Sequence, residues 1–273
     1  MKTYDISKLK DNLTAEIGRM ATSAAKPVSL LILLGTESPD AEYYADSLVK
    51  KGKKLGIPAK IERYSGKAGF DSVIKKIDRD PSVSAIALSP YPADLDFRHV
   101  SSGMPLNKDA DCSGYRLAGS LFWGFTDIAP ATAKSVFLIA SEFFGGDMSG
   151  KHAVICGRSV RVGKPLVPLL LSINATVTIC HSKTADIASL TKAADCVICA
   201  IGRPGFFKRG HFSPGQLVID VGINKTETGF TGDVDTGDIE DSDITLTPVK
   251  NGVGTLTSLL IYKNLLDLLH LQE

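Results

Sequence analysis

The clearest indication of the fold is the segment Lys151–Pro165, KHAVICGRSVRVGKP. An apolar run stops at Gly157, and a helix-like segment opens near Gly163 with a proline in its first turn, where proline is tolerated. The pattern predicts a strand, a glycine loop and the start of a helix. Such a junction directs helix N–H groups and the positive end of the helix dipole at the strand tip, so it favours a phosphate there. Charge and a hydroxyl at that tip come from Arg158, Ser159 and Arg161.

The next apolar run, Ala175–Cys180, ends in His181, Ser182 and Lys183. An NAD-specific site usually carries an acidic residue at this strand end, where it binds the ribose hydroxyls. A hydroxyl followed by a base suits a 2′-phosphate instead, so the sequence favours NADP. The glycine loop departs from the usual G-x-G-x-x-G spacing, so an ordinary strand-to-helix turn is the alternative interpretation of that loop taken alone.

Apolar runs of strand length alternate with helix-like segments on both sides of this junction. The pattern is typical of an α/β fold with parallel sheets, divided into two α/β units. Strands are predicted at residues 28–34, 59–64, 83–88, 152–156, 175–180, 195–200 and 216–221. Helices are predicted over residues 6–20, 39–55, 69–77, 131–145 and 255–271, the last packing back on an earlier unit. The acidic loop Gly232–Asp243 is expected to be solvated.

Composition limits the partners that the chain is expected to have. The 273 residues carry a formal net charge of +1, so no overall field attracts nucleic acid or a membrane surface. The N-terminal segment lacks the apolar core of a signal peptide, and no apolar run approaches the roughly 20 residues that span a bilayer. We therefore expect a soluble cytoplasmic protein with neither nucleic acid nor membrane as a partner.

The cysteines and histidines do not form a metal site in this interpretation. Cys196 and Cys199 make a C-x-x-C pair, but residues three apart in a strand point to opposite faces, so the two thiols cannot share a metal or a disulfide. The histidines show no metal-ligand spacing. We expect buried thiols and no bound metal.

Five separated stretches resemble the bifunctional methylenetetrahydrofolate dehydrogenase/cyclohydrolase family, in the same order and spacing. They are GRSVRVGKP (157–165), ATVTICHSKT (175–184), VIDVGIN (218–224), GDV (232–234) and TPVKNGVGTLT (247–257). Looser matches upstream are GTESPDAEYY (35–44), SPYP (89–92) and KDAD (108–111).

This resemblance implies two α/β domains flanking a cleft. A catalytic, folate-binding domain would comprise residues 1–131 plus 252–273, and a Rossmann-like NADP-binding domain residues 132–251. The implied cofactor is NADP, and the implied substrate is a folate that carries one-carbon units for purine, methionine and histidine synthesis. The family also implies a homodimer.

Roles carried over from the family fall on matching positions of this chain. Phosphate binding falls on Gly157, Arg158 and Ser159. The ribose phosphate would face Ser182 and Lys183, and the nicotinamide end would face Ile223. The folate would stack on Tyr44, with its pterin ring bonded to Asp111. Asp220, at a strand end, is equally compatible with a site residue and with a structural hydrogen-bond acceptor.

Two departures from the family stand in the first half of the chain. Where the family has its catalytic lysine, four residues after Tyr44, this chain has Leu48, and Leu88 replaces a supporting glutamine. Hydride transfer depends on proximity and orientation and tolerates this loss, whereas hydrolysis needs a positioned proton-transfer group. Lys51, two helical turns from Tyr44, is a candidate substitute, and a solvated lysine face is the alternative.

The sequence therefore predicts an NADP-dependent methylenetetrahydrofolate dehydrogenase whose cyclohydrolase activity is weakened or lost. Two alternatives stay open. The first is a dehydrogenase acting on another reduced pterin. The second is a non-catalytic NADPH-binding protein.

Overall fold

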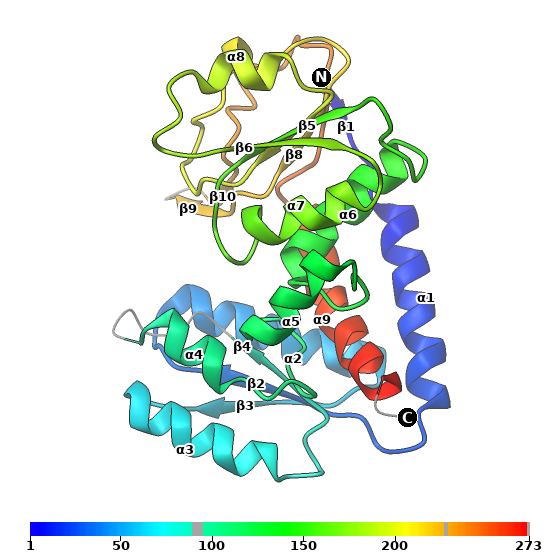
Figure 1. The fold of residues 1–273 in the computed structure, drawn as a ribbon, viewed down its shortest axis with the longest axis vertical. Helices are drawn as coiled ribbons and strands as arrows, with labels where there is room; N and C mark the ends of the chain where they lie inside the picture. The colour runs from blue at the N-terminus through cyan, green and yellow to red at the C-terminus, as the bar shows by residue number, and fades with distance from the viewer. Residues whose placement is uncertain (89–94, 227–228, 272–273) are drawn as a thin grey trace. The chain divides into compact units, whose positions relative to one another are not determined.

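The computed structural model describes residues 1–88, 95–226 and 229–271, and it divides the chain into two compact units. One unit joins Met1–Lys10 to Thr132–Thr257, and the other joins Asp11–Ala131 to the segment from Ser258 onward. Each unit contains a parallel sheet with helices, so the predicted α/β class is confirmed (Figure 1). The folate-binding and NADP-binding roles of the two parts stay predictions.

The unit that begins at Asp11 is built on a three-stranded parallel sheet. Strand β2 (Leu30–Leu34) lies between β3 (Ala59–Arg63) and β4 (Ala85–Leu88). Its continuous apolar sequence fits this central position, where side chains are buried on both faces. The helices of this part of the chain are α1 (Ser7–Ser23), α2 (Pro39–Leu55), α3 (Gly66–Asp78), α4 (Phe97–Gly103) and α5 (Tyr115–Ser120), followed by the 3₁₀ turn η1 (Leu121–Trp123).

Helix α2 begins and ends where its sequence predicts. The Ser38 hydroxyl oxygen accepts a hydrogen bond from the Ala41 N–H (3.3 Å), and Gly56 ends the helix in the left-handed conformation, with φ of 72°. The last helix, α9 (Val253–His270), packs against α2, because the Tyr262 hydroxyl donates a hydrogen bond to the Leu48 carbonyl (2.7 Å).

The other unit contains a six-stranded parallel sheet in the order β1-β11-β8-β7-β5-β6 (Figure 1). The strands are β1 (Lys2–Thr3), β5 (His152–Cys156), β6 (Thr176–Cys180), β7 (Cys196–Cys199), β8 (Leu217–Asp220) and β11 (Thr245–Leu246). The other elements are α6 (Ala131–Phe143), α7 (Gly163–Leu171), α8 (Ile187–Lys192), the 3₁₀ turn η2 (Arg209–His211) and the hairpin of β9 (Asn224–Thr226) and β10 (Gly229–Thr231).

The expectation that Gly232–Asp243 is solvated is confirmed in part: Thr236–Asp238 and Glu240–Asp241 are exposed, but the start of the segment and Ile239 are buried. Asp233, Val234 and Ile239 in this segment are buried. The Asp233 carboxylate is held inside the protein because backbone N–H groups of a neighbouring loop donate to it. The acidic composition of this segment predicts that its side chains are exposed. The Asp233 carboxylate is instead buried, because backbone N–H groups satisfy its hydrogen-bonding capacity.

The five thiols are all free and buried, as predicted. Over the described residues, no helix has both the length and the apolar character needed to cross a membrane.

Candidate functional site

The glycine loop after β5 requires glycine at two positions for steric reasons. Gly157 has φ of 130°, and a Cβ atom there would collide with the Ala200 carbonyl oxygen of the neighbouring strand end. A Cβ atom at Gly163 would collide with the Gly157 carbonyl oxygen. The two glycines thus bring β5, the loop and α7 into close contact without the usual glycine spacing.

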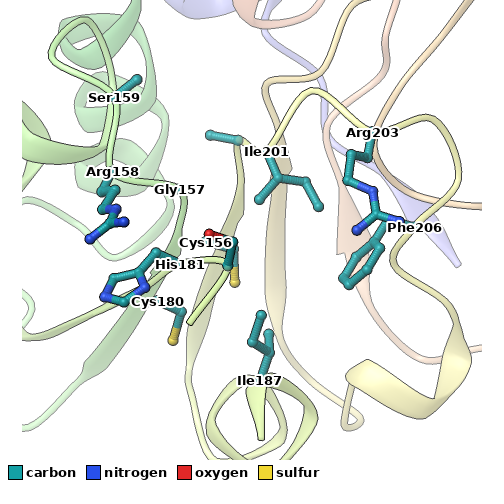
Figure 2. A pocket seen from close by; sticks show the side chains of 12 residues that line it. Cys156, Gly157, Arg158, Ser159, Cys180, His181, Ile187, Ile201, Arg203 and Phe206 are labelled. Carbon is teal, nitrogen blue, oxygen red and sulfur yellow. The ribbon is translucent and has the colours of Figure 1, made fainter. Parts of the chain in front are cut away.

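A pocket of about 320 Å³ opens beside this loop, wholly inside the unit that contains the six-stranded sheet (Figure 2). Its floor is formed by apolar side chains and thiols at the ends of three adjacent strands and on α8: Cys156, Cys180, Ile187, Ala200 and Ile201. Polar and aromatic groups line the rest: Gly157, Arg158, Ser159, His181, Ser182, Arg203 and Phe206. An apolar floor with a few polar groups is typical of small-molecule sites.

The thiols of the floor are uncharged. Burial raises the pKa of Cys156 to about 12, with Cys180 beside it adding to the shift. Burial also raises the pKa of Cys180. Both thiols therefore behave as small apolar groups, and the positive charge of the pocket lies on its arginines.

Local hydrogen bonds fix the two polar turns at the ends of β5 and β6. The Ser159 hydroxyl oxygen accepts from the Val162 N–H (3.1 Å), which leaves the hydroxyl hydrogen able to donate to a ligand. At the end of β6, the Lys183 N–H donates to His181 Nδ1 (3.1 Å), and the His181 N–H donates to the Thr184 hydroxyl (3.0 Å). This turn presents Ser182 at the pocket.

A third loop, residues 201–207, borders the pocket and is fastened by the buried carboxylate of Asp233. The Asp233 carboxylate oxygens accept hydrogen bonds from the N–H groups of Ile201 (2.7 Å), Gly202 (2.9 Å) and Arg203 (2.9 Å). Further along, the Phe207 N–H donates to the Asp233 carbonyl (2.9 Å). Sequence reasoning missed this loop as part of the site, although the GDV motif that contains Asp233 was one signal that could have found it.

Asp220 is a structural acceptor. Its carboxylate accepts from the N–H groups of Gly222 (2.9 Å), Asp233 (3.0 Å) and Val234 (3.0 Å). Burial nevertheless raises the pKa of Asp220 to about 6. A Cβ atom at Gly232 would collide with this carboxylate, so the segment that carries Asp233 can approach only with glycine there.

The structure brings four of the six predicted cofactor residues to one pocket: Gly157, Arg158, Ser159 and Ser182. The other two predicted cofactor-binding residues, Lys183 and Ile223, do not line this pocket. Lys183 is exposed next to it, and Ile223 is 58% exposed. Ile223 lies close enough that a Cβ atom on Gly254 would touch its side chain (3.4 Å).

Tyr44, Lys51 and Leu48, which lie on α2 of the other unit, differ in exposure. Tyr44 and Lys51 are half-buried, whereas Leu48 is fully buried. Leu88, at the end of β4, is also fully buried and belongs to an apolar cluster with Leu33 and Phe70. Positions 48 and 88 are thus part of the core. The SPYP stretch, residues 89–92, lies outside the described residues.

Asp111 lies in a turn that its neighbours hold firmly. The buried Asp109 carboxylate accepts from the N–H groups of Ser113 (3.0 Å) and Gly114 (2.6 Å). The buried Lys108 ammonium donates to the carbonyls of Ile77 (2.8 Å) and Asp80 (2.6 Å), at the end of α3. Burial lowers the pKa of Lys108. Asp111 itself is half-buried.

Among the described residues, no group of three or more His, Cys, Asp or Glu side chains is placed to hold a metal ion.

Comparisons with known proteins match one family over nearly the whole chain. A family model described as tetrahydrofolate dehydrogenase/cyclohydrolase, NAD(P)-binding domain, matches residues 130–273. A bifunctional protein FolD from Clostridium botulinum (strain Langeland) is 36% identical over 266 residues, covering 95% of this chain and 94% of the relative. The bifunctional protein FolD 2 from Desulfitobacterium hafniense is 35% identical over 274 residues, covering 98% and 96%.

Solved structures agree with these sequence matches. A bifunctional 5,10-methylenetetrahydrofolate dehydrogenase/cyclohydrolase from Thermoplasma acidophilum superposes with a TM-score of 0.91 at 30% identity, covering 99% of each chain. The enzyme from Trypanosoma brucei, solved with NADP and an inhibitor, superposes with a TM-score of 0.88 at 25% identity, covering 99% of this chain and 97% of that one.

Proposed function

The chain belongs to the tetrahydrofolate dehydrogenase/cyclohydrolase family, and on that premise we propose that it oxidises 5,10-methylenetetrahydrofolate to 5,10-methenyltetrahydrofolate with NADP as the hydride acceptor. The observation that carries the proposal is the pocket bounded by the glycine loop and the His181–Ser182 turn (Figure 2). It has the apolar floor, basic groups and close backbone approach that an adenine dinucleotide needs.

The residues present fit NADP, since Arg158, Ser159 and Ser182 line one pocket whose remaining lining is largely apolar. When bound, the cofactor supplies the ring that accepts hydride. The chain binds and orients it: Gly157, Arg158 and Ser159 hold phosphates, and Arg158 joins Ser182 and Lys183 at the ribose 2′-phosphate. Charge-assisted hydrogen bonds to phosphate are among the stronger ones. Ile223 lines the nicotinamide end.

For the folate, we propose that Tyr44 stacks on the ring system and that Asp111 bonds to the pterin. The rigid turn around Asp111 supports this role, because the hydrogen bonds of Asp109 and Lys108 fix its backbone. A fixed carboxylate orients the methylene carbon, and orientation is the main requirement of hydride transfer. No protein base is needed for that step.

Cyclohydrolase activity, the second activity of the family, is weakened or lost in this proposal. Hydrolysis of the methenyl product needs water activation and proton transfer, for which a positioned group contributes about 10²–10⁴ in rate. Leucine at positions 48 and 88 cannot transfer a proton, and both side chains are fully buried. Lys51, half-buried on the same helix, is the candidate substitute.

The test is one assay in which NADPH formation and methenyltetrahydrofolate are followed together at two wavelengths. We expect NADPH to rise while methenyltetrahydrofolate accumulates and decays at its uncatalysed rate. Decay faster than the no-enzyme control would contradict the loss of cyclohydrolase activity, and Lys51→Met would then show whether Lys51 is responsible.

Two buried leucines at catalytic positions favour a second candidate function, a non-catalytic NADPH-binding protein. The same assay separates the two, because any turnover above the no-enzyme control removes this candidate. A dehydrogenase acting on another reduced pterin would bind NADP and turn over only with that other carrier.

We further propose a cytoplasmic homodimer that serves one-carbon metabolism. Light scattering after size exclusion would test the subunit count, with twice the 29.1 kDa chain mass expected.

A further inference from the structure

Arg203 and Phe206 form a cation–π pair at one wall of the pocket. The Arg203 guanidinium carbon lies 4.7 Å from the centroid of the Phe206 ring, within the range of a cation–π contact. Figure 2 shows this pair across the pocket from Arg158 and His181, with Ile201 between the two walls. The pocket therefore has a second cationic group, Arg203, in addition to Arg158 at the glycine loop.

The backbone beneath this pair is held in place. The Arg203 N–H is bonded to the buried Asp233 carboxylate (2.9 Å), and the Gly205 N–H donates to the Gly232 carbonyl (3.2 Å). The Phe206 ring packs edge-on against the fully buried Phe207, at a centroid distance of 5.0 Å. The wall is thus positioned before any ligand arrives, which lowers the cost of ordering it on binding.

The floor next to this wall is apolar and uncharged, so it suits a flat base better than a phosphate. A guanidinium is planar and weakly hydrated, and it stacks on aromatic faces on either side of its plane. We propose that Arg203, held against the Phe206 ring, stacks on the adenine base of the dinucleotide and contributes equally to the affinity for NADP and NAD. This inference rests on the proposed function, and it separates a base-binding wall from the phosphate-binding residues.

The test is a fluorescence titration of the full-length protein with NADPH and with NADH. Arg203→Ala should raise the dissociation constants of both by the same factor, about 3- to 30-fold, the range of one cation–π contact. Arg203→Lys should recover little of the loss, because an ammonium lacks the planar face. Phe206→Leu, which keeps an apolar side chain, should also weaken both cofactors by equal factors.

A truncated ligand and a control variant complete the design. 5′-AMP keeps the adenine but lacks the nicotinamide and the 2′-phosphate, so its affinity should fall by the same factor in Arg203→Ala. Arg209→Ala removes an exposed arginine of the same unit that bonds to Asp238 outside the pocket, and it should leave all three affinities unchanged. Equal melting temperatures of Arg203→Ala and the wild type would exclude unfolding as the cause.

Loss of NADPH affinity alone would overturn the inference, since the arginine would then bind the 2′-phosphate. Unchanged affinities would overturn it too, while leaving the proposed function intact if the wild type binds both cofactors and turns over. A wild-type protein that binds neither NADPH nor NADH would instead contradict the proposed function.

Discussion

Arg158 and Ser182 follow neighbouring strands whose last residues, Cys156 and Cys180, are paired in register. The register brings both turns to one edge of the sheet, where both line the pocket. We expect Arg158→Ala or Ser182→Ala to weaken NADP binding about 10- to 100-fold, because a hydrogen bond to a charged group contributes about 1.5–3 kcal/mol. Binding of NAD, which lacks the 2′-phosphate, should change far less.

Calorimetric titration with each cofactor measures that difference. Lys192→Ala, at the exposed end of α8, is the control for loss of one positive charge in the same unit. Equal losses for NADP and NAD would remove Arg158 and Ser182 from 2′-phosphate recognition.

Asp220 makes the free energy of unfolding depend on pH. The direction is opposite to that of a carboxyl group whose pKa is lowered on folding. Burial raises its pKa from an unfolded value near 3.8 to about 6, so the folded protein binds this proton more tightly than the unfolded chain. The free energy of unfolding should therefore decrease as pH rises from about 4 to about 6 and stay level above that. The contribution at this site is on the order of 3 kcal/mol.

Urea denaturation of the wild type and Asp220→Asn between pH 4 and pH 7 isolates this effect, because the variant has no titrating group at the site. Asp147 is a control of opposite sign. Hydrogen bonds from Asn174 and Ser149 lower the pKa of its exposed carboxyl, so its contribution disappears as pH falls. Parallel curves for wild type and Asp220→Asn would contradict the role given to Asp220.

At the scale of elements, Gly52 decides how closely α2 and α9 pack. A Cβ atom there would collide with the Tyr262 hydroxyl and with the Ile57 carbonyl. Helix propensity alone predicts that Gly→Ala in a helix stabilises by about 0.5–1 kcal/mol. We expect the opposite at this position, a loss of about 1–3 kcal/mol from overpacking.

Gly18→Ala in α1 is the matched control, because a Cβ atom at Gly18 meets nothing within 4 Å. This variant should gain the stability that helix propensity predicts. Melting curves of both variants measure the two signs, and a stabilised Gly52→Ala would show that the packing at α9 relaxes easily.

At the scale of the whole molecule, the N-terminal residues complete a sheet formed by the second half of the chain. The Lys2 N–H donates to the Ile244 carbonyl (2.8 Å), and the Tyr4 N–H donates to the Leu246 carbonyl (2.8 Å). Deleting residues 1–5 should destabilise this sheet by about 2 kcal/mol, since each net backbone hydrogen bond contributes about 1 kcal/mol.

Hydrogen exchange by mass spectrometry localises that loss. We expect peptides containing β11 and β8 to exchange faster in the truncated protein, and peptides containing β2 to be unchanged. Equal acceleration in both units would show that the N-terminal strand stabilises the whole chain rather than its own sheet.

Features that depend on neighbours along the chain follow from the amino-acid sequence alone. The apolar runs predicted the strands β2 and β5 to within two residues, and the helix predicted over residues 39–55 matches α2, because these elements leave a local pattern in the sequence. The glycine loop and the turn after β6 also identified four residues of the pocket, since a strand tip is defined locally.

Features that depend on residues far apart in the chain become visible only in the folded protein. The burial of Asp233, the pairing of β1 with β11 and the cation–π pair of Arg203 and Phe206 leave no periodic signal. Leu48 illustrates both kinds of feature, the local one and the long-range one. Its sequence position revealed the missing lysine, whereas its burial comes from packing and from the hydrogen bond of Tyr262, 214 residues later. The burial of a side chain depends on the residues that pack around it, and many of these come from distant segments of the chain.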